Sequence, residues 1–500
     1  MFSRPSFIRA ANAPANGTIP STVQDLETFG GGQRRRGVRV YRPRSEEEVA
    51  GLVSRLAADG STFAPFGAGL SFDSQGLNDR VVISTAGLRS LHVDHHGKRL
   101  RAGAGVTTGE AQSAALEVGL TLPVLPSSSR ITLGGSASCD SYSRMTPGLG
   151  RESRYIRSFR IVTGRGETFR CSRNENRDLF FAAIGGFGLA GIITEVEHQL
   201  TAVGAHAAFR SSAHAFLGVT GFEYLIPEHR PPGLPAGPWP GAGSIVLAPG
   251  GRVRTMVTRH RYEDTRHRAR SVVHQRGTAR LLLDLLVREL PSLAGWLWRV
   301  NWVPHRPVQL VDDFSPATFF MDGHLDGAAI SRRLGRPTSV LQQSYVIPIA
   351  NRDKSSVRPV ERFVEEAQRR IGEAGMSAGM FDVGFLPAGE PFVLSANRSS
   401  DAFLVSLAFM AKGNSQPAAI HRLFEELTDR CAKDYGGTVH LTKQAHCSDD
   451  VLRALYAEPI ERLRQLRATH DPAGRIDTYL GRRLGLSSPA SLETLLHGRA

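Results

Sequence analysis

Cysteine is scarce in this sequence, with four residues among 500. They are too scattered for a disulfide scaffold, and no pair has the C-x-x-C spacing of a zinc or dithiol site. The first twenty residues, MFSRPSFIRAANAPANGTIP, lack the continuous apolar run of a secretory signal. We therefore expect no structural metal and no signal peptide, and a cytoplasmic location.

Uninterrupted apolar runs are also lacking. The most apolar stretch, residues 281–303, contains Asp284, Arg288, Glu289 and Pro291. These residues exclude a membrane span. Burial against the rest of its domain is the simplest interpretation, and peripheral contact of its tryptophans with a membrane surface stays open as the alternative.

Acidic residues are outnumbered, 47 against 61 Lys and Arg, which gives a net charge of +14. Basic surfaces attract nucleic acid, anionic lipid or phosphorylated ligands. No nucleic-acid-binding motif accompanies the charge, so we expect no nucleic-acid partner and interpret the basic segments, including 251–280, as solvated surface. A chain of this length forms two domains or three.

The pattern of short elements is that of an α+β protein. Residues 38–56 predict a strand, a turn and a helix capped by Ser45 with Glu48. Hairpins are expected at "DHHGKR" and "TGRGE", and a helix at "TGEAQSAALEVGL". The Pro- and Gly-rich residues 228–243 predict a linker or mobile loop. Further elements are a strand at 339–349 and helices at 357–374, 416–433 and 449–468.

Residues 185–196, "GGFGLAGIITEV", contain the G-x-G-x-x-G spacing of a dinucleotide-binding turn. A Rossmann turn needs a strand before the glycines and a helix after them. Here a helical apolar pattern precedes them and a β-branched, alternating pattern follows. The motif therefore does not indicate a nicotinamide-dependent dehydrogenase.

Three Gly- and Ser-rich segments do occur in the same half of the chain, "PFGAGLS" (65–71), "PSSSRITLGGSASCD" (126–140) and "GGFGLAGIIT" (185–194). Glycine lets the backbone approach a ligand within hydrogen-bond distance. Several such segments together can surround a large dinucleotide with backbone N–H groups, which suit a pyrophosphate.

The ordered series "YRPRSEEEVAGLV", "FAPFGAGLS", "RAGAGVTTGEAQSAALEVGLTLPVLP", "RITLGGSASCD", "IRSFRIVTGRGE" and "DLFFAAIGGFGLAGIIT" carries a resemblance. The chain resembles FAD-linked oxidoreductases of the vanillyl-alcohol-oxidase (p-cresol methylhydroxylase-type, PCMH-type) superfamily. Through "YGGTVHLTK" and "DPAGRIDTYLGRRLGL" it most resembles the decaprenylphosphoryl-β-D-ribose 2'-oxidase subgroup. The resemblance is strong over 38–200, moderate over 316–485 and slight between them.

The resemblance implies an α+β fold with a PCMH-type FAD-binding domain of two subdomains at 38–205. A substrate-binding domain with an antiparallel sheet would occupy 206–430, and 431–485 would return to the FAD domain. Residues 1–37 would form an N-terminal extension and 486–500 a tail.

The resemblance also implies which residues contact FAD. From the first loop these are Gly67, Ala68, Gly69, Leu70 and Ser71. From the second they are Ser127, Ser128, Ser129, Thr132, Gly134, Gly135, Ser138 and Cys139. The third loop would contribute Gly188, Gly191 and Ile193, and His440 would flank the flavin. Leu70 stands where covalent members carry His, and because leucine cannot form that bond we expect dissociable FAD.

Three positions depart from the subgroup: Phe66 replaces Arg, Tyr142 replaces the His near the flavin, and Asp382 aligns with a substrate-site Lys. An anion in place of a cation disfavours a phosphorylated substrate. Lys443 is retained, and a cation near reduced flavin stabilises its developing negative charge. The expected catalytic residues are Lys443, Tyr142 and Gln342.

The expected activity is oxidation of a CH–OH group of a sugar or polyol-like small molecule, with hydride transfer to flavin N5. Two alternatives of other classes stay open. One is a degenerate flavoprotein that keeps FAD for structure only, and the other is a basic surface-binding protein without a cofactor.

Overall fold

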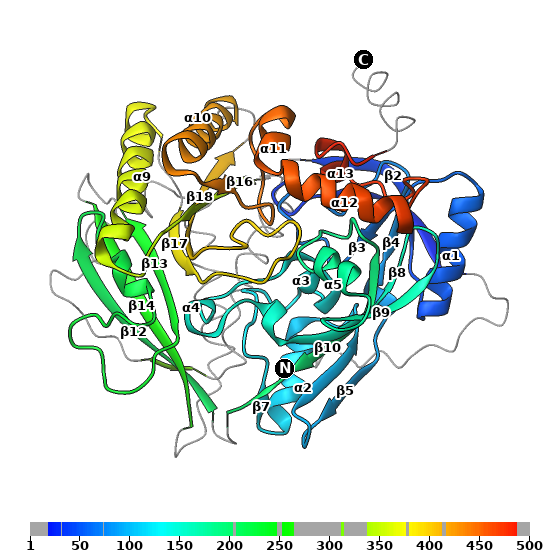
Figure 1. Ribbon diagram of the computed structural model, residues 1–500, viewed down its shortest axis with the longest axis horizontal. Coiled ribbons are helices and arrows are strands. Elements are labelled where there is room, and N and C mark those ends of the chain that lie inside the picture. Colours follow the sequence, from blue (N-terminus) through cyan, green and yellow to red (C-terminus); the bar gives the residue numbers. More distant parts are fainter. Residues whose placement is uncertain are drawn as a thin grey trace, which may run out of the picture.

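The computed structural model describes residues 19–31, 33–73, 75–203, 207–247, 253–264, 312–314, 338–376, 380–412 and 417–487. The tryptophan-rich stretch at 281–303 and most of the basic 251–280 segment lie outside these ranges. Two smaller sheets form one side of the molecule and one large sheet forms the other, with short helices between them (Figure 1).

The first small sheet has the order β1 (Ser21–Glu27), β2 (Arg34–Tyr41), β4 (Val81–Ser84), β3 (Ala64–Phe66). Helix α1 (Glu46–Ala58) begins at the predicted cap, where the Ser45 hydroxyl accepts from the Glu48 N–H. The Glu48 carboxylate accepts from the backbone of Arg44. The sheet starts earlier than residue 38, because β1 and the start of β2 belong to the segment assigned to an N-terminal extension.

The second small sheet is antiparallel. Its order is β5 (Leu91–Asp94), β6 (Arg99–Gly103), β10 (Ile192–Gln199), β8 (Ile156–Val162), β9 (Thr168–Ser172). Both predicted hairpins are confirmed, as is the helix α2 (Thr108–Glu117). The third glycine segment lies between α5 (Arg177–Ala183) and β10. This helix–glycine–strand order confirms that the segment is not a Rossmann turn.

The large sheet is antiparallel throughout its described pairings and has eight strands. In order they are β15 (Asp312–Phe314), β12 (Ala207–Leu217), β14 (Arg254–Asp264), β13 (Gly241–Leu247), β17 (Met380–Leu386), β18 (Ala402–Lys412), β16 (Thr338–Pro348) and β19 (Thr438–Val439). Helices α9 (Lys354–Glu373) and α10 (Pro417–Tyr435) lie beside it (Figure 1).

The register of β16 fixes which side chains face the helices. The Gln343 amide donates to the Thr428 hydroxyl at 2.7 Å, and the Tyr345 hydroxyl donates to the Phe424 carbonyl at 3.2 Å, both on α10. Because side chains alternate along a strand, Gln342 and Ser344 point to the opposite face. That face is turned away from α10.

The Pro-rich segment is irregular, as predicted, but it is neither a linker nor loose. Arg259 of β14 is 1% exposed, and its guanidinium donates to backbone carbonyls of the segment, including that of His229 at 2.9 Å. Trp239 is buried beneath Arg261, whose guanidinium carbon lies 4.5 Å from the ring centroid. The last residues of the segment begin β13. A buried guanidinium with several carbonyl partners holds the loop against the sheet.

The chain after β19 forms α11 (Asp449–Leu455), α12 (Ala457–His470) and α13 (Tyr479–Arg483). The helix predicted at 449–468 is thus two helices, divided at Tyr456, whose buried hydroxyl donates to the Val439 carbonyl at 2.6 Å. Beyond α12 the chain pairs with the first sheet: the N–H of Asp477 donates to the carbonyl of Phe63 at 2.9 Å.

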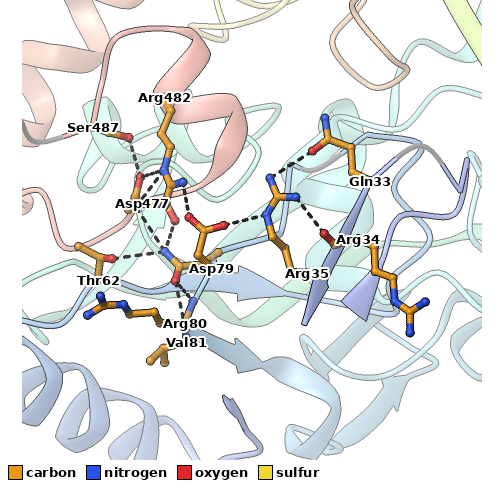
Figure 2. A network of polar contacts seen from close by, with 11 residues as sticks. Gln33, Arg34, Arg35, Thr62, Asp79, Arg80, Val81, Asp477, Arg482 and Ser487 are labelled. Carbon is orange, nitrogen blue, oxygen red and sulfur yellow. Dashed lines mark hydrogen bonds and ion pairs between the residues drawn. The ribbon is translucent and has the colours of Figure 1, made fainter. Parts of the chain in front are cut away.

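Figure 2 shows the polar network at this junction. Asp477 is fully buried and accepts from the Arg482 guanidinium at 2.7 Å and from the Ser487 hydroxyl at 2.7 Å. Arg482 also pairs with Asp79, which lies 2.7 Å from Arg35 of β2. The C-terminal segment is therefore joined to the first sheet by charged groups and by backbone pairing. Within the described residues no helix has the length and apolar character needed to span a membrane.

Candidate flavin site

The three glycine-rich segments meet. A Cβ added to Gly67 would lie 2.6 Å from the Thr132 hydroxyl, so the first loop lies directly against the start of α3 (Leu133–Cys139). The third segment is fixed to the same helix, because the Phe187 N–H donates to the Ser138 carbonyl at 2.8 Å. It also reaches the first, since a Cβ on Gly188 would lie 3.0 Å from Pro65.

The two glycines of α3 have different surroundings. A Cβ on Gly134 would meet the Ala104 side chain at 2.7 Å, so this glycine permits close packing between α3 and the chain after β6. A Cβ on Gly135 would meet only the Thr132 hydroxyl, at 2.9 Å. Apart from that hydroxyl, the added carbon on Gly135 would face open space.

The remaining residues of the predicted FAD set are distributed unevenly. Ala68 and Ser127 are exposed, and Gly67, Gly69, Leu70, Ser71, Ser129, Ser138 and Cys139 are half-buried. Gly188, Gly191 and Ile193 are buried, and Ile193 pairs with Ile161 in the second sheet. The half-buried residues, which belong to the first two loops, are the part of the set that a bound dinucleotide can reach, and their contact with FAD stays a prediction.

Lys443 lies between the first loop and the large sheet. Its backbone carbonyl accepts from the Gln75 amide at 3.3 Å, and its ammonium lies 4.1 Å from the centroid of the Phe72 ring. Burial lowers the pKa of Lys443 to about 8, and the nearby Asp382 and Cys139 act in the opposite direction. The structure thus brings a retained cation of the motif close to the second loop and to the sheet.

Tyr142 and His440 form an edge-to-face pair with ring centroids 5.6 Å apart. Burial and the neighbouring Asp382 raise the pKa of Tyr142, so its phenol is a proton donor at neutral pH. Burial, Arg151 and Lys443 lower the pKa of His440, which makes its imidazole neutral. Burial also raises the pKa of the Cys139 thiol to about 12.

Gln342 lies two residues before Ser344 on β16, on the face of the large sheet that is turned away from α10. Its backbone exchanges two hydrogen bonds with Gln444, one of them from the Gln342 N–H to the Gln444 side chain at 2.7 Å. Gln444 directly follows Lys443. Gln342 is therefore joined through its backbone to the segment that carries Lys443.

Several side chains at this site were not found from sequence. Phe72 and Gln75, which contact Lys443, follow the glycines of the first loop in an unremarkable loop sequence. Gly30 was placed in an extension, yet its carbonyl accepts from Val340 of β16 at 2.9 Å, and a Cβ on it would lie 2.8 Å from the Phe72 carbonyl. The glycine run "FGGGQ" at 29–33 is the one sequence feature that indicates a close approach of this backbone to the first loop.

Four half-buried side chains, Cys139, Tyr142, Asp382 and Lys443, come from different elements and influence one another's ionisation. Each keeps accessible surface, although burial shifts the pKa of each. These four side chains form a polar cluster beside the second glycine segment. This arrangement fits a dinucleotide whose reactive ring must be held near polar groups.

Comparison with known proteins defines the class. Residues 38–172 match a family model described as an FAD binding domain. The chain is 32% identical to decaprenylphosphoryl-beta-D-ribose oxidase of Mycolicibacterium smegmatis, over 33% of this chain and 34% of that protein. It is 33% identical to cytokinin dehydrogenase 8 of Oryza sativa subsp. indica, over 36% and 37% of the two chains. It is 30% identical to (R)-6-hydroxynicotine oxidase of Paenarthrobacter nicotinovorans, over 31% and 34%.

Residues 38–172 are therefore assigned as an FAD-binding domain, the cofactor is FAD, and this part of the chain is similar to FAD-dependent oxidoreductases. The match spans about a third of the length of these curated relatives. The match to the family model contains the first two glycine loops, whereas β1, β10 and the large sheet lie outside it.

Proposed function

We propose that this protein is an FAD-dependent oxidoreductase that oxidises a CH–OH group of a sugar or polyol-like molecule. The observation that carries the proposal is the position of Lys443, a half-buried cation between the first glycine loop and the large sheet. The three relatives are named for three different substrates, so the FAD-binding domain by itself does not select one.

We assign cofactor binding and substrate binding to different sheets. The two small sheets would be the two subdomains that hold FAD, and the large sheet would close the substrate side, with residues 206–430 as the substrate domain. The contacts of Phe63 with Asp477 support the return of 431–485 to the FAD domain. Leu70 offers no nucleophile in the first loop, which favours dissociable FAD.

Bound FAD supplies a two-electron acceptor for the substrate C–H bond. The residues of this chain would position the substrate and its charges. Lys443 would stabilise negative charge that develops beside it, and Tyr142, held protonated, would donate a hydrogen bond. Gln342 and Ser344 would offer polar groups from the sheet face.

The test is anaerobic mixing of the FAD-loaded protein with uncharged alditols and aldoses, followed by the loss of flavin absorbance. Loss of absorbance with at least one donor is expected. The replacements at Phe66 and Tyr142 favour one rival, a flavoprotein that keeps FAD without catalysis. FAD that stays oxidised with every donor, in a protein that binds it fully, would establish that rival.

Replacement Lys443→Met is expected to leave FAD bound and to slow flavin reduction about 100-fold, the cost of losing one charge-stabilising group at a reaction centre. In the wild type the ammonium is lost as the pH rises through about 8, so the reduction rate should fall over that range. Stopped-flow reduction across pH checks both. An unchanged rate in the variant would remove Lys443 from the site.

A further inference from the structure

Asp382 lies at the centre of the large sheet, on the face that carries Ser344. In the β17–β18 register it stands opposite Ser406, and in the β18–β16 register Ser406 stands opposite Ser344. Directly opposed residues of neighbouring strands share a face. The two serine hydroxyls bond one another. Asp382 therefore continues a polar row that crosses three strands on the site side of the sheet.

The half-buried carboxylate of Asp382 has no hydrogen bond or ion pair with the residues that the structure describes. The nearest cations, Arg144 and Lys443, act on it only as neighbouring charges. Elsewhere in the described chain a buried carboxylate such as Asp477 has three partners. An unpartnered carboxylate in this polar cluster is available for a ligand.

Three charged or titratable groups of the described chain act on Asp382: Lys443, which follows β19, and Tyr142 and Arg144, which lie between α3 and α4 (Thr146–Leu149). Cys139 and His440 in turn lie close to Lys443. The loop of Arg144 contacts the sheet itself, because the Ala242 N–H donates to the Arg144 carbonyl at 2.7 Å. Arg144 and Lys443 are the two cations that favour the ionised carboxylate.

Among these groups only Asp382 suits the role of a base. Tyr142 and Cys139 are held protonated, and protonation of His440 is opposed by burial and by two cations. Lys443 is protonated below about pH 8. Burial raises the pKa of Asp382 above that of an ordinary aspartate, which makes the carboxylate a stronger proton acceptor.

We propose that Asp382 is the proton acceptor for the substrate hydroxyl, an assignment that rests on the proposed function. The substrate CH–OH loses its hydroxyl proton to the Asp382 carboxylate and its C–H hydrogen, with the bonding electron pair, to FAD. The C–O single bond becomes a carbonyl, the substrate is oxidised by two electrons and FAD is reduced by two. The proton then leaves Asp382 to solvent.

The deciding variant is Asp382→Asn, which keeps size and hydrogen bonding but cannot accept the proton. It is expected to keep its FAD and the change in flavin absorbance that a bound alditol produces, while reduction slows at least about 100-fold. The wild-type rate should fall at low pH as Asp382 protonates, and that decline should vanish in the variant. Asp382→Glu should recover part of the rate. Asp429→Asn, at an exposed carboxylate of α10, serves as the control.

A second readout does not depend on turnover. Asp382 raises the pKa of Lys443, so Asp382→Asn should lower that pKa further below about 8. The pH titration of flavin absorbance in the loaded, substrate-free protein measures this. An unchanged titration would contradict the placement of Asp382 beside Lys443.

The outcomes separate the two proposals. If alditols reduce the flavin equally fast in wild type and Asp382→Asn, the base is another group and the proposed function stands. If the variant no longer binds the alditol, Asp382 is a binding residue and the assignment is wrong. If no donor reduces wild-type flavin, the proposed function fails and the role of Asp382 fails with it.

Discussion

Gly135→Val is expected to yield a folded protein that holds much less FAD than the wild type. The valine side chain would project from α3 into the space beside the first loop, where only the Thr132 hydroxyl lies close to its Cβ. Rotation of the Thr132 hydroxyl would relieve this contact but would break the N-cap bond that it accepts from the Gly135 N–H. Loss of a cap costs about 1 kcal/mol, which leaves the protein folded. The added methyl groups would occupy the approach of the dinucleotide. Overpacking of about 1–3 kcal/mol corresponds to FAD binding weakened about 5- to 140-fold.

Two other glycines provide matched controls. Gly134→Val would push the Cβ against Ala104, including its backbone carbonyl at 3.2 Å, and should lower the melting temperature. Gly51→Val on α1 meets nothing within 4 Å and should change neither property. The flavin-to-protein absorbance ratio and a thermal melt measure both effects. A fully loaded Gly135→Val protein would show that the second loop does not approach FAD.

Asp477→Ala is expected to cause the largest loss of stability. It would leave the Arg482 guanidinium, 8% exposed, without its principal partner, and would remove acceptors for Ser487 and Asn78. Removing one member of a buried charge pair costs about 3–5 kcal/mol. The C-terminal segment would then separate more easily from the first sheet.

Asp79→Ala is the comparison, because Asp79 also pairs with Arg482 but its side chain is 39% exposed. A smaller loss is expected there, since water can replace a half-exposed carboxylate. Urea unfolding of both variants measures the difference. Equal losses would mean that burial of Asp477 does not determine the strength of the junction.

Local sequence patterns predicted the elements well where a short-range signal exists. Ser45 caps α1 as predicted because its hydroxyl accepts from an N–H three residues on, and both hairpins follow from their turn residues. The glycine loop at 186–191 was correctly distinguished from a Rossmann turn, because a helical pattern precedes it and a strand pattern follows it. The break at Tyr456 was missed, because it depends on a tertiary bond to Val439 that the helical pattern does not reveal.

The site was only partly predictable for the same reason. Motif resemblance supplied Lys443, Tyr142, Cys139 and His440, which the structure brings together. The part played by Asp382 depends on strand register across β16, β17 and β18. No local pattern specifies which residues stand opposite one another in strands so far apart in the chain.

Two contacts of the N-terminal segment also depend on tertiary structure. Strand β1 pairs with β2 in the first sheet, and Gly30 contacts β16 beside the first loop. They assign a structural role to a segment whose own sequence has few apolar residues. Arg259 is a comparable case, because its partners are backbone carbonyls that any sequence could supply.

The most direct test of the account is the visible absorption spectrum of the purified protein, repeated on the supernatant after acid precipitation. The account predicts a flavin spectrum whose colour passes entirely into the supernatant, as dissociable FAD requires. Colour retained in the pellet would contradict the argument from Leu70. A colourless protein that stays colourless after incubation with FAD would contradict the central claim that these three loops hold the cofactor.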